Sequence, residues 1–528
     1  MRVLIIFLLF LLASGCGKKE DVSQKEVLNL SFGSQVRTLD PRLGGEHPTS
    51  HLIRMLFDGL IRRDEQGNLA PATAEKYTVS EDFKTYTFIL RKTFWNDGMP
   101  VTAYDFEYAW KKCLDPNTVS HGAHNFYFIK NAKLSVEGKI PVSEVGVTAL
   151  DSYTFQVELE YPVPYVFDVL DSTFFYPIPK HLDETDPSWI YRTDQSFVSN
   201  GPFNLKKWKQ GECVTVEKSP SYWDQKNVYL SEIRISFLED GMTQLYMYEK
   251  NQLDWIGDPV SKIPPEVLEN LRKDGTCSYV ASPRVFWYFL NSETFPFNNK
   301  KMRQAFSYAM DRNEIVEYIL GGNALPAYGI IAPCFGLEKS DCFEDRKFDQ
   351  AKRLFDEALL EEGITLEMFP VLTIRYSTGS ETMSRISQTV QQIWEKTFGI
   401  KVTLHQSDWP VHFTALQNGD YEIGMMSWFS SIEDPIDILQ TFKYKHDRVN
   451  MSNWESQEYL DLIEVSNYET NPKKRNCLLT AAEKILMDEM PIIPIYYVGM
   501  EFSKKTELTG VNLPPTGGID FKFASFSQ

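Results

Sequence analysis

Strand and helix patterns alternate through the second half of this chain, and that alternation limits the folds open to it. After Pro283 a continuous apolar run, Val285 to Leu290, precedes a helical pattern that Asn298 or Asn299 can cap. Further helix and strand patterns cover residues 348–363, 372–376, 383–399, 402–404 and 492–498. Repeated units of this kind predict an α/β lobe in which helices cover a sheet.

The first half of the chain is richer in strands and contains one clear strand, turn and helix unit between Tyr86 and Pro116. Thr102 and Asp105 have the spacing of a capping box at the start of that helix. The segment from about Leu60 to Pro179 is therefore predicted to be a compact insertion between two parts of a larger domain.

The amino terminus has the features of a secretion signal over residues 1–15. Arg2 precedes an apolar run that is too short to span a bilayer as a helix. The small residues before Cys16 resemble a bacterial lipoprotein cleavage site, which predicts Cys16 as the lipidated amino terminus and residues 16–26 as a tether. Ordinary signal cleavage that leaves Cys16 unmodified is the alternative. Either outcome places the mature protein on the extracytoplasmic face of the membrane, in the periplasm where there is one.

Charge and motifs exclude several classes of function. A formal net charge of −18 argues against nucleic acid as a partner. The sequence contains no GxSxG, HExxH, P-loop or dinucleotide fingerprint, so we predict no enzyme, no catalytic residue and no cofactor. His121 and His124 lack a third ligand at a suitable spacing, so no metal site is predicted. Cys334 and Cys342 flank a loop, and the sequence leaves open a disulfide or two thiols.

Motifs spread over almost the whole mature chain carry a family resemblance. WNDGMPVTAYDFEYAWKKCLDP at 95–116 resembles a signature segment of the oligopeptide-binding proteins that serve ABC importers. Further collinear matches are LDPRLGG at 39–45, LFDGLIRRDEQGNLAPATAEKYTVSEDFKTYTFILR at 56–91, VPYVFDVL at 163–170, NGPFNLKKWKQGE at 200–212, PSYWD at 220–224, FNNKKMRQAFSYAMDR at 297–312 and IPIYYV at 493–498.

The resemblance implies a three-lobed periplasmic binding protein fold of the α/β class, with two α/β lobes joined by a hinge and a smaller inserted lobe. Lobe I is expected to comprise residues 27–57, 181–283 and 499–528, lobe II residues 58–180, and lobe III residues 284–498. It also implies a monomer that captures an oligopeptide or peptide-like solute between lobes I and III and passes it to an ABC permease.

Family members hold an extended peptide by pairing its backbone with a strand, which here is expected over Met425–Ser431. Backbone groups of Ser427 and Phe429 are expected to face the ligand. The ligand-binding residues implied by the resemblance are Gly45, Glu46, His47, Arg284, Trp409, Met425, Ser427, Trp428, Phe429 and Ser431.

Two departures from the family concern charge. Ser431 replaces the aspartate that pairs with the peptide's α-ammonium, and Leu416 and Met425 replace arginines that serve its carboxyl end. Glu433, Asp434 or Glu46 is a candidate to replace the aspartate. If none does, the free amino terminus is not the anchor, and we expect affinity to survive amino-terminal acetylation better than in typical family members.

Arg284 and Phe429 occupy the positions of the family's cysteine pair, which places a cation beside the site. Arg284 is therefore a candidate to accept a ligand carboxylate, for example the extra carboxyl group of a murein fragment. An arginine at the surface end of a strand is the alternative. Other ligands that the same fold serves are a nickel chelate and haem. An extracellular hydrolase or chaperone on this scaffold is the alternative from another class.

Overall fold

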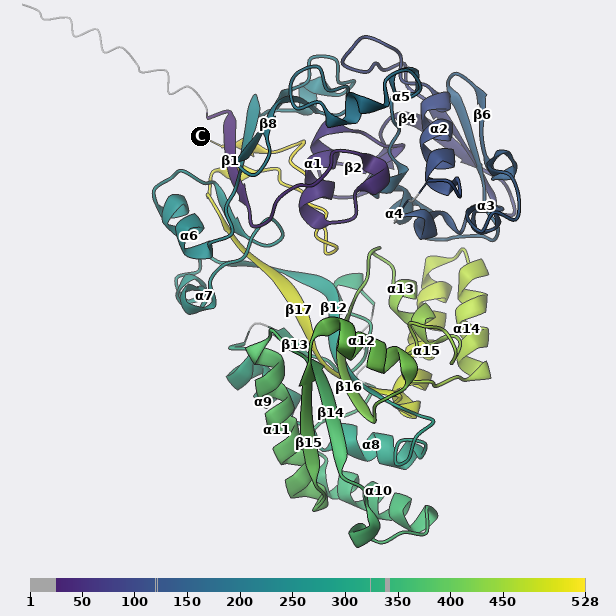
Figure 1. Ribbon diagram of the computed structural model, residues 1–528, viewed down its shortest axis with the longest axis vertical. Coiled ribbons are helices and arrows are strands. Elements are labelled where there is room, and N and C mark those ends of the chain that lie inside the picture. The colour runs from purple at the N-terminus through teal and green to yellow at the C-terminus, as the bar shows by residue number, and fades with distance from the viewer. Residues whose placement is uncertain (1–24, 119, 121, 323, 338–341, 528) are drawn as a thin grey trace, which may run out of the picture.

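The computed structural model describes residues 25–118, 120, 122–322, 324–337 and 342–527. The signal, Cys16, most of the tether and His121 lie outside the described residues. The chain forms an upper and a lower body joined by two long strands, as Figure 1 shows. Among the described residues, no helix is both long and apolar enough to cross a membrane.

The upper body contains two four-stranded sheets that share one apolar core. The first sheet has the order β1 (Val27–Phe32), β10 (Glu232–Phe237), β9 (Cys213–Lys218), β8 (Phe203–Lys209). The second is antiparallel, in the order β4 (Ala74–Val79), β5 (Thr85–Leu90), β7 (Thr154–Glu158), β6 (Val147–Asp151). A two-stranded ribbon, β2 (Ile61–Arg63) with β3 (Leu69–Pro71), lies between them in sequence.

Helices complete the upper body. They are α1 (His47–Leu56), α2 (Ala103–Leu114), α3 (Ala132–Val136), α4 (Val166–Leu170), α5 (Lys180–Asp183), α6 (Gly241–Glu249) and α7 (Pro265–Lys273). The predicted capping box of α2 is present, because the Thr102 backbone N–H donates to Asp105 Oδ2 at 2.7 Å.

A seven-stranded sheet forms the base of the lower body and reaches into the upper one, where its residues Trp255 and Phe502 pack in the upper core. Its order is β11 (Trp255–Gly257), β17 (Ile492–Lys504), β12 (Ser278–Leu290), β16 (Ile423–Phe429), β14 (Leu372–Ser377), β15 (Val402–Ser407), and β13 (Ala324–Pro326) also pairs with β17. Alternate side chains of β12 enter two separate cores. One core is covered by α8 (Lys300–Tyr308), α10 (Phe348–Glu361) and α11 (Glu381–Phe398), and the other by α13 (Ile436–Leu439), α14 (Gln457–Tyr468) and α15 (Pro472–Glu489).

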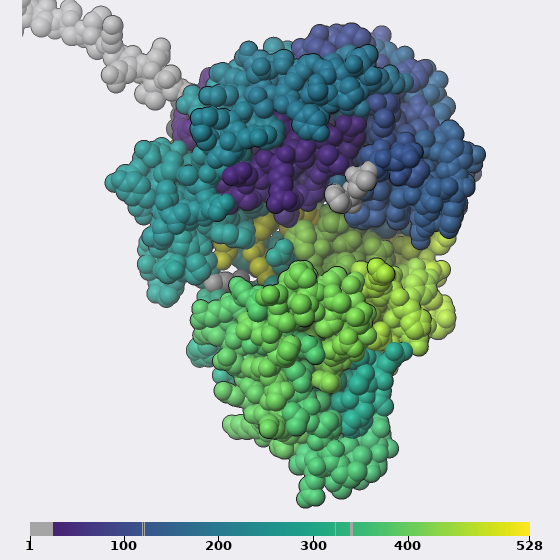
Figure 2. Space-filling model, viewed as in Figure 1, coloured from purple at the N-terminus to yellow at the C-terminus, as the bar shows by residue number. Residues whose placement is uncertain are grey.

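The two bodies are connected by β12 and β17, which pair with each other over most of their thirteen residues each. Their register shifts between Ala281 and Arg284, where the strands pass from one body to the other. Figure 2 shows the hollow that these strands leave between the bodies. The architecture confirms the predicted α/β class.

Several predicted element boundaries were wrong. The sequence pattern predicts a short helix over residues 51–59, but helix α1 begins at His47, since Pro48 fits the first turn of a helix. The helical pattern after Asn299 ends at Tyr308 and resumes in α9 (Arg312–Glu314), which continues into a π-helical turn. Strand β16 ends at Phe429, so Ser431 follows the strand instead of lying in it.

Candidate functional site

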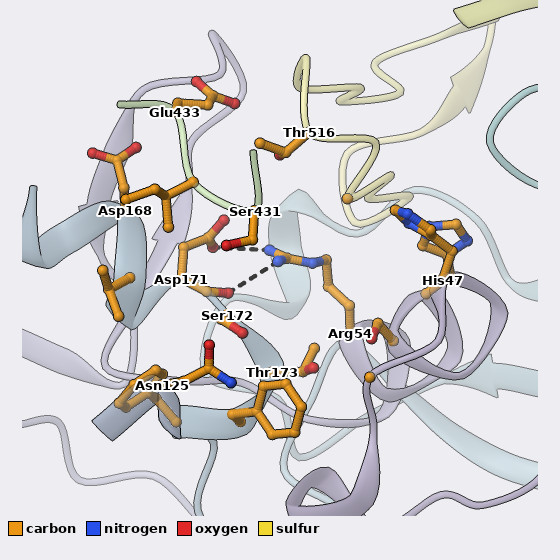
Figure 3. A pocket seen from close by; sticks show the side chains of 18 of the residues that line it. His47, Arg54, Asn125, Asp168, Asp171, Ser172, Thr173, Ser431, Glu433 and Thr516 are labelled. Atoms are coloured by element: carbon orange, nitrogen blue, oxygen red, sulfur yellow. Dashed lines mark hydrogen bonds and ion pairs between the residues drawn. The ribbon is translucent and has the colours of Figure 1, made fainter. Parts of the chain in front are cut away.

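A cavity of about 300 Å³ lies where the upper body meets the loop that follows β16. Its wall comes from six separate parts of the chain, which are Gly45 with α1, Arg63 of β2, Asn125, α4 with residues 171–175, residues 429–433, and the turn at 516–518. Figure 3 places Asp168 and Glu433 on one side of this pocket and His47 on the other.

One face of α1 supplies His47, His51 and Arg54 to the cavity, because these positions are four and three residues apart on a helix. The His51 Nε2 atom lies 2.9 Å from the carbonyl oxygen of Gly517. Burial lowers the pKa of His51 to about 3, and burial with the charge of Arg284 lowers the pKa of His47. Both imidazoles are therefore mostly neutral near pH 7.

Strand β16 has an open backbone edge beside the groove. Its pairing with β12 covers the whole strand, whereas its pairing with β14 involves only Ile423 and Gly424. The Ser430 N–H donates to the Pro283 carbonyl, so even-numbered residues hydrogen-bond to β12 and odd-numbered ones face away from it. Backbone groups of Ser427 and Phe429 consequently point to the open edge. Within the described residues, no partner is recorded for them there.

Arg284 lies directly opposite Phe429 in the ladder, at a pair that is not hydrogen-bonded, where side chains approach most closely. Its guanidinium carbon is 5.1 Å from the centre of the Phe429 ring. In the part of the chain that the structure describes, Arg284 has no recorded hydrogen bond or ion pair. Burial lowers the pKa of Arg284, with Asp258 and Tyr496 opposing that shift. A largely buried, unpaired cation is suited to receiving an anion.

In the cavity itself, three carboxylates lie around Arg63. The Arg63 guanidinium is 3.0 Å from Glu433, 3.6 Å from Asp171 and 3.8 Å from Asp168. Burial raises the pKa of Asp168 to about 7 and also raises the pKa of Glu433. Asp171 is better satisfied, because its Oδ1 accepts from Arg54 at 2.8 Å.

The structure brings together four of the residues implied by the resemblance. Gly45, His47, Phe429 and Ser431 line the cavity, and the Phe429 ring packs edge-on against His47 across the groove, 5.8 Å between centres.

The other implied residues lie elsewhere. Glu46 precedes α1 and pairs with Arg37 on the surface. Trp409 begins α12 (Trp409–Asn418), is half exposed and packs against Phe413. The Met425 side chain is 2% exposed in the core, and its carbonyl accepts from His412. Trp428 packs against the core beneath α13 to α15.

Sequence reasoning missed Arg54, Arg63, Asp168 and Asp171 as cavity residues. One signal was present: Asp168 and Asp171 stand three residues apart among apolar residues in VPYVFDVLD, which places two carboxylates on one face of a short helix. Cys334 and Cys342 are not joined by a disulfide. Among the described residues, no group of three or more His, Cys, Asp or Glu is placed to hold a metal.

Comparison with known proteins agrees with this architecture. A family model described as "Bacterial extracellular solute-binding proteins, family 5 Middle" matches residues 68–450. The chain is 35% identical to the oligopeptide-binding protein OppA of Bacillus subtilis, over 100% of this chain and 98% of that protein. It is 32% identical to the dipeptide-binding protein DppE of the same organism, over 97% of this chain and 94% of the relative.

Solved structures support the same assignment. The unliganded open form of MppA, a periplasmic murein tripeptide binding protein, superposes with a TM-score of 0.84 at 27% identity, covering 95% of this chain and 97% of the other. OppA of Haemophilus influenzae in complex with the peptide RPPGFSPFR gives 0.72 at 25% identity, covering 96% and 99%.

Proposed function

The chain belongs to the family 5 bacterial extracellular solute-binding proteins, and we propose that it captures peptides outside the cytoplasmic membrane and delivers them to an ABC permease. The observation that carries this proposal is the open edge of β16. Ser427 and Phe429 present N–H and C=O groups beside a groove between two bodies. An extended peptide satisfies such an edge by adding one more strand, which binds the backbone whatever the side chains are.

The surroundings of β16 suit a ligand that carries charge. Arg284 offers a guanidinium beside Phe429 that no carboxylate in the described part of the chain pairs with. Asp168 and Glu433 lie on the far side of the cavity from His47, at 3.8 and 3.0 Å from Arg63. A ligand carboxylate near Arg284 gains a charge-assisted hydrogen bond.

Capture requires the groove to close over the ligand. The strands β12 and β17 connect the bodies, and their irregular register at Ala281 to Arg284 gives the backbone a place to bend. Closure is then a rigid-body rotation that ligand binding favours, because the ligand contacts both bodies only in the closed state. Binding makes and breaks no covalent bond in this proposal.

Attachment to the membrane is proposed to use a lipid on Cys16, with the chain acting as a monomer. The apolar run that ends in Ser14-Gly15-Cys16 supports this. Mass spectrometry of the mature amino terminus tests it. An amino terminus at another residue, or an unmodified Cys16, contradicts it.

The capture proposal is tested by incubating the purified protein with a peptide library and analysing the bound and free fractions by native mass spectrometry. We expect intact peptides in the bound fraction. Time-dependent cleavage that a point mutation abolishes supports a hydrolase instead, and a retained metal or haem supports the other ligand classes.

A pair of variants tests the role of the strand edge. Ser427→Pro removes one N–H from the open edge and leaves the ladder with β12 intact, while Ser427→Ala keeps that N–H and removes only the hydroxyl. We expect Ser427→Pro to weaken peptide binding at least about tenfold and Ser427→Ala to leave it unchanged. Equal affinities for the two variants contradict backbone pairing at this edge.

A further inference from the structure

We propose that Asp168 and Glu433, one from each body, form a subsite for a cationic group of the ligand, either an ammonium or a guanidinium. This inference rests on the proposed capture of peptides and specifies which chemical group the cavity selects. The sequence alone left Glu433, Asp434, Glu46 or no residue as the replacement for the carboxylate missing at Ser431. The structure separates these possibilities.

The charges around the cavity do not balance. Arg54 already binds Asp171. Its Nη1 donates to Asp171 Oδ1 at 2.8 Å, and its Nη2 donates to the Asp171 carbonyl at 2.9 Å. Arg63 is then the remaining guanidinium for Asp168 and Glu433. With His47 and His51 neutral, three carboxyl groups face two cations, so the cavity wall carries an excess negative charge whenever Asp168 is ionised.

The contacts of Arg63 with these carboxylates are also incomplete. The Arg63 side chain is only 10% exposed, yet its Nε has no hydrogen-bond partner. Glu433 Oε1 is 3.0 Å from Arg63 Nη2 but is likewise buried without a well-aligned hydrogen bond. Asp168 approaches Arg63 no closer than 3.8 Å. Buried polar atoms in native structures are nearly always satisfied, so Glu433 Oε1, an acceptor at the cavity wall without a well-aligned hydrogen bond, has capacity for a further donor, whereas Arg63 Nε is itself a donor and lacks an acceptor.

The electrostatics point the same way. Burial raises the pKa of Asp168 to about 7, with Arg63 opposing the shift and Glu433, Asp434 and Asp171 adding to it. The carboxylate is thus held in a site where its charge is poorly compensated. A cationic group beside it restores the balance and stabilises the ionised form.

The competing candidates are excluded by their own contacts. Asp434 accepts hydrogen bonds from both terminal nitrogens of Arg475, at 2.6 and 2.8 Å, so its charge is already compensated. Glu46 lies outside the cavity lining and pairs with Arg37, and both side chains are more than half exposed. Ser431 has a neutral hydroxyl, and its N–H is already bound by Asp437 at 3.1 Å.

The position of the two carboxylates also links cation binding to closure. Asp168 belongs to α4 of the upper body, and Glu433 follows β16 of the lower body. A cation held between them attracts both bodies. Ligands with a suitably placed cation are therefore expected to favour the closed state more than neutral ones.

The test uses three synthetic tetrapeptide mixtures built from neutral residues. One has free amino termini, the second is acetylated, and the third is acetylated with lysine at one position, which separates an α-ammonium from a side-chain cation. Native mass spectrometry compares the wild type with Asp168→Asn and Glu433→Gln. Glu46→Gln is the matched control, since it removes one carboxylate near the groove but outside the cavity.

We expect the wild type and Glu46→Gln to retain the free-amine or the lysine mixture at least about tenfold more strongly than the acetylated neutral one, a difference of about 1.4 kcal/mol. Asp168→Asn and Glu433→Gln should each reduce that preference and leave binding of the neutral mixture unchanged. Thermal melting of each variant confirms that it is folded.

Equal retention of all three mixtures by the wild type overturns the subsite and leaves peptide capture standing. Preference that survives in both Asp168→Asn and Glu433→Gln also overturns it. If the folded wild type retains none of the mixtures, peptide capture fails and the subsite fails with it.

Discussion

Arg62 and Arg63 are neighbours on β2, carry the same side chain, and sit in opposite electrostatic situations. Successive residues of a strand face opposite sides, so Arg62 enters the core of the upper body while Arg63 faces the cavity. Arg62 donates to both oxygens of Asp520 at 2.7 and 2.8 Å, and to the Arg54 carbonyl at 2.9 Å. It also lies 3.2 Å from Asp58.

Arg63, by contrast, is shared among three carboxylates at 3.0 to 3.8 Å and leaves its Nε without a hydrogen bond. Asp434 and Glu433 repeat the contrast on the lower body, where Asp434 is held by Arg475 and Glu433 faces the cavity. A buried charge is tolerated when hydrogen bonds replace its hydration. The charged groups that support the fold, Arg62 and Asp434, are therefore fully hydrogen-bonded. Those at the cavity, Arg63 and Glu433, can still form hydrogen bonds with a ligand.

The largest change in stability is expected from removing Arg62, whose hydrogen bonds to Asp520 and Asp58 are buried in the fold. Arg62→Leu leaves Asp520 and Asp58 buried without their hydrogen-bonded cation, so the free energy of unfolding should fall by about 3–5 kcal/mol. Urea denaturation measures this. Arg234→Leu is the control, because Arg234 pairs with Glu232 on the surface with 60% of its side chain exposed. Similar losses for the two variants contradict the assignment of Arg62 to the fold.

Replacing Asp168, whose charge is poorly compensated, should raise the free energy of unfolding instead of lowering it. The folded pKa of Asp168, about 7, lies above its unfolded value near 3.9, so ionisation costs the folded protein stability as pH rises between these values. Asp168→Asn removes that cost. At pH 8 we expect it to be more stable than the wild type, on the order of 2–4 kcal/mol, with the difference vanishing below about pH 4.

Denaturation curves at pH 4, 6 and 8 check this expectation. The groups facing Asp168 are Arg63, Asp171, Glu433 and Asp434, so Glu433→Gln should shift the midpoint of the pH dependence downward. A variant that is less stable than the wild type at pH 8 would show that Asp168 supports the fold.

Arg284 differs from Arg62 and Arg63, because it makes no ion pair with a carboxylate of the described residues. Arg284→Ala is expected to weaken binding of acidic ligands about tenfold or more, about 1.4 kcal/mol, because their carboxylate loses its counter-charge. Calorimetry with an acidic peptide and its amide counterpart measures the loss. An equal loss for both ligands contradicts a charge-specific role and points to packing against Phe429.

The smallest effect is expected at Glu46. Glu46→Gln should change neither the thermal midpoint nor ligand affinity measurably, because an exposed ion pair such as Glu46 with Arg37 contributes little. Calorimetry and thermal melting measure both. A clear loss of affinity would place Glu46 at the ligand.

Local sequence determined much of the fold. The capping box of Thr102 and Asp105, the helix α10 over its predicted span and the stop of α11 at Gly399, with φ of 73°, all depend on residues close in sequence. The resemblance carried by motifs such as WNDGMPVTAYDFEYAWKKCLDP gave the family correctly. Among the ligand-binding residues that it implied, His47, Phe429 and Ser431 line the cavity.

Only the tertiary structure decided which charges are available to a ligand. Sequence presents Arg62 beside Arg63 and Glu433 beside Asp434 as equivalent pairs. Their partners Asp520, Asp168 and Arg475 lie far away in the chain, and distance along the chain says nothing about which carboxylate meets which guanidinium. Because the electrostatic role of a charge depends on its neighbours in space and on its access to water, that role is fixed only when the chain has folded.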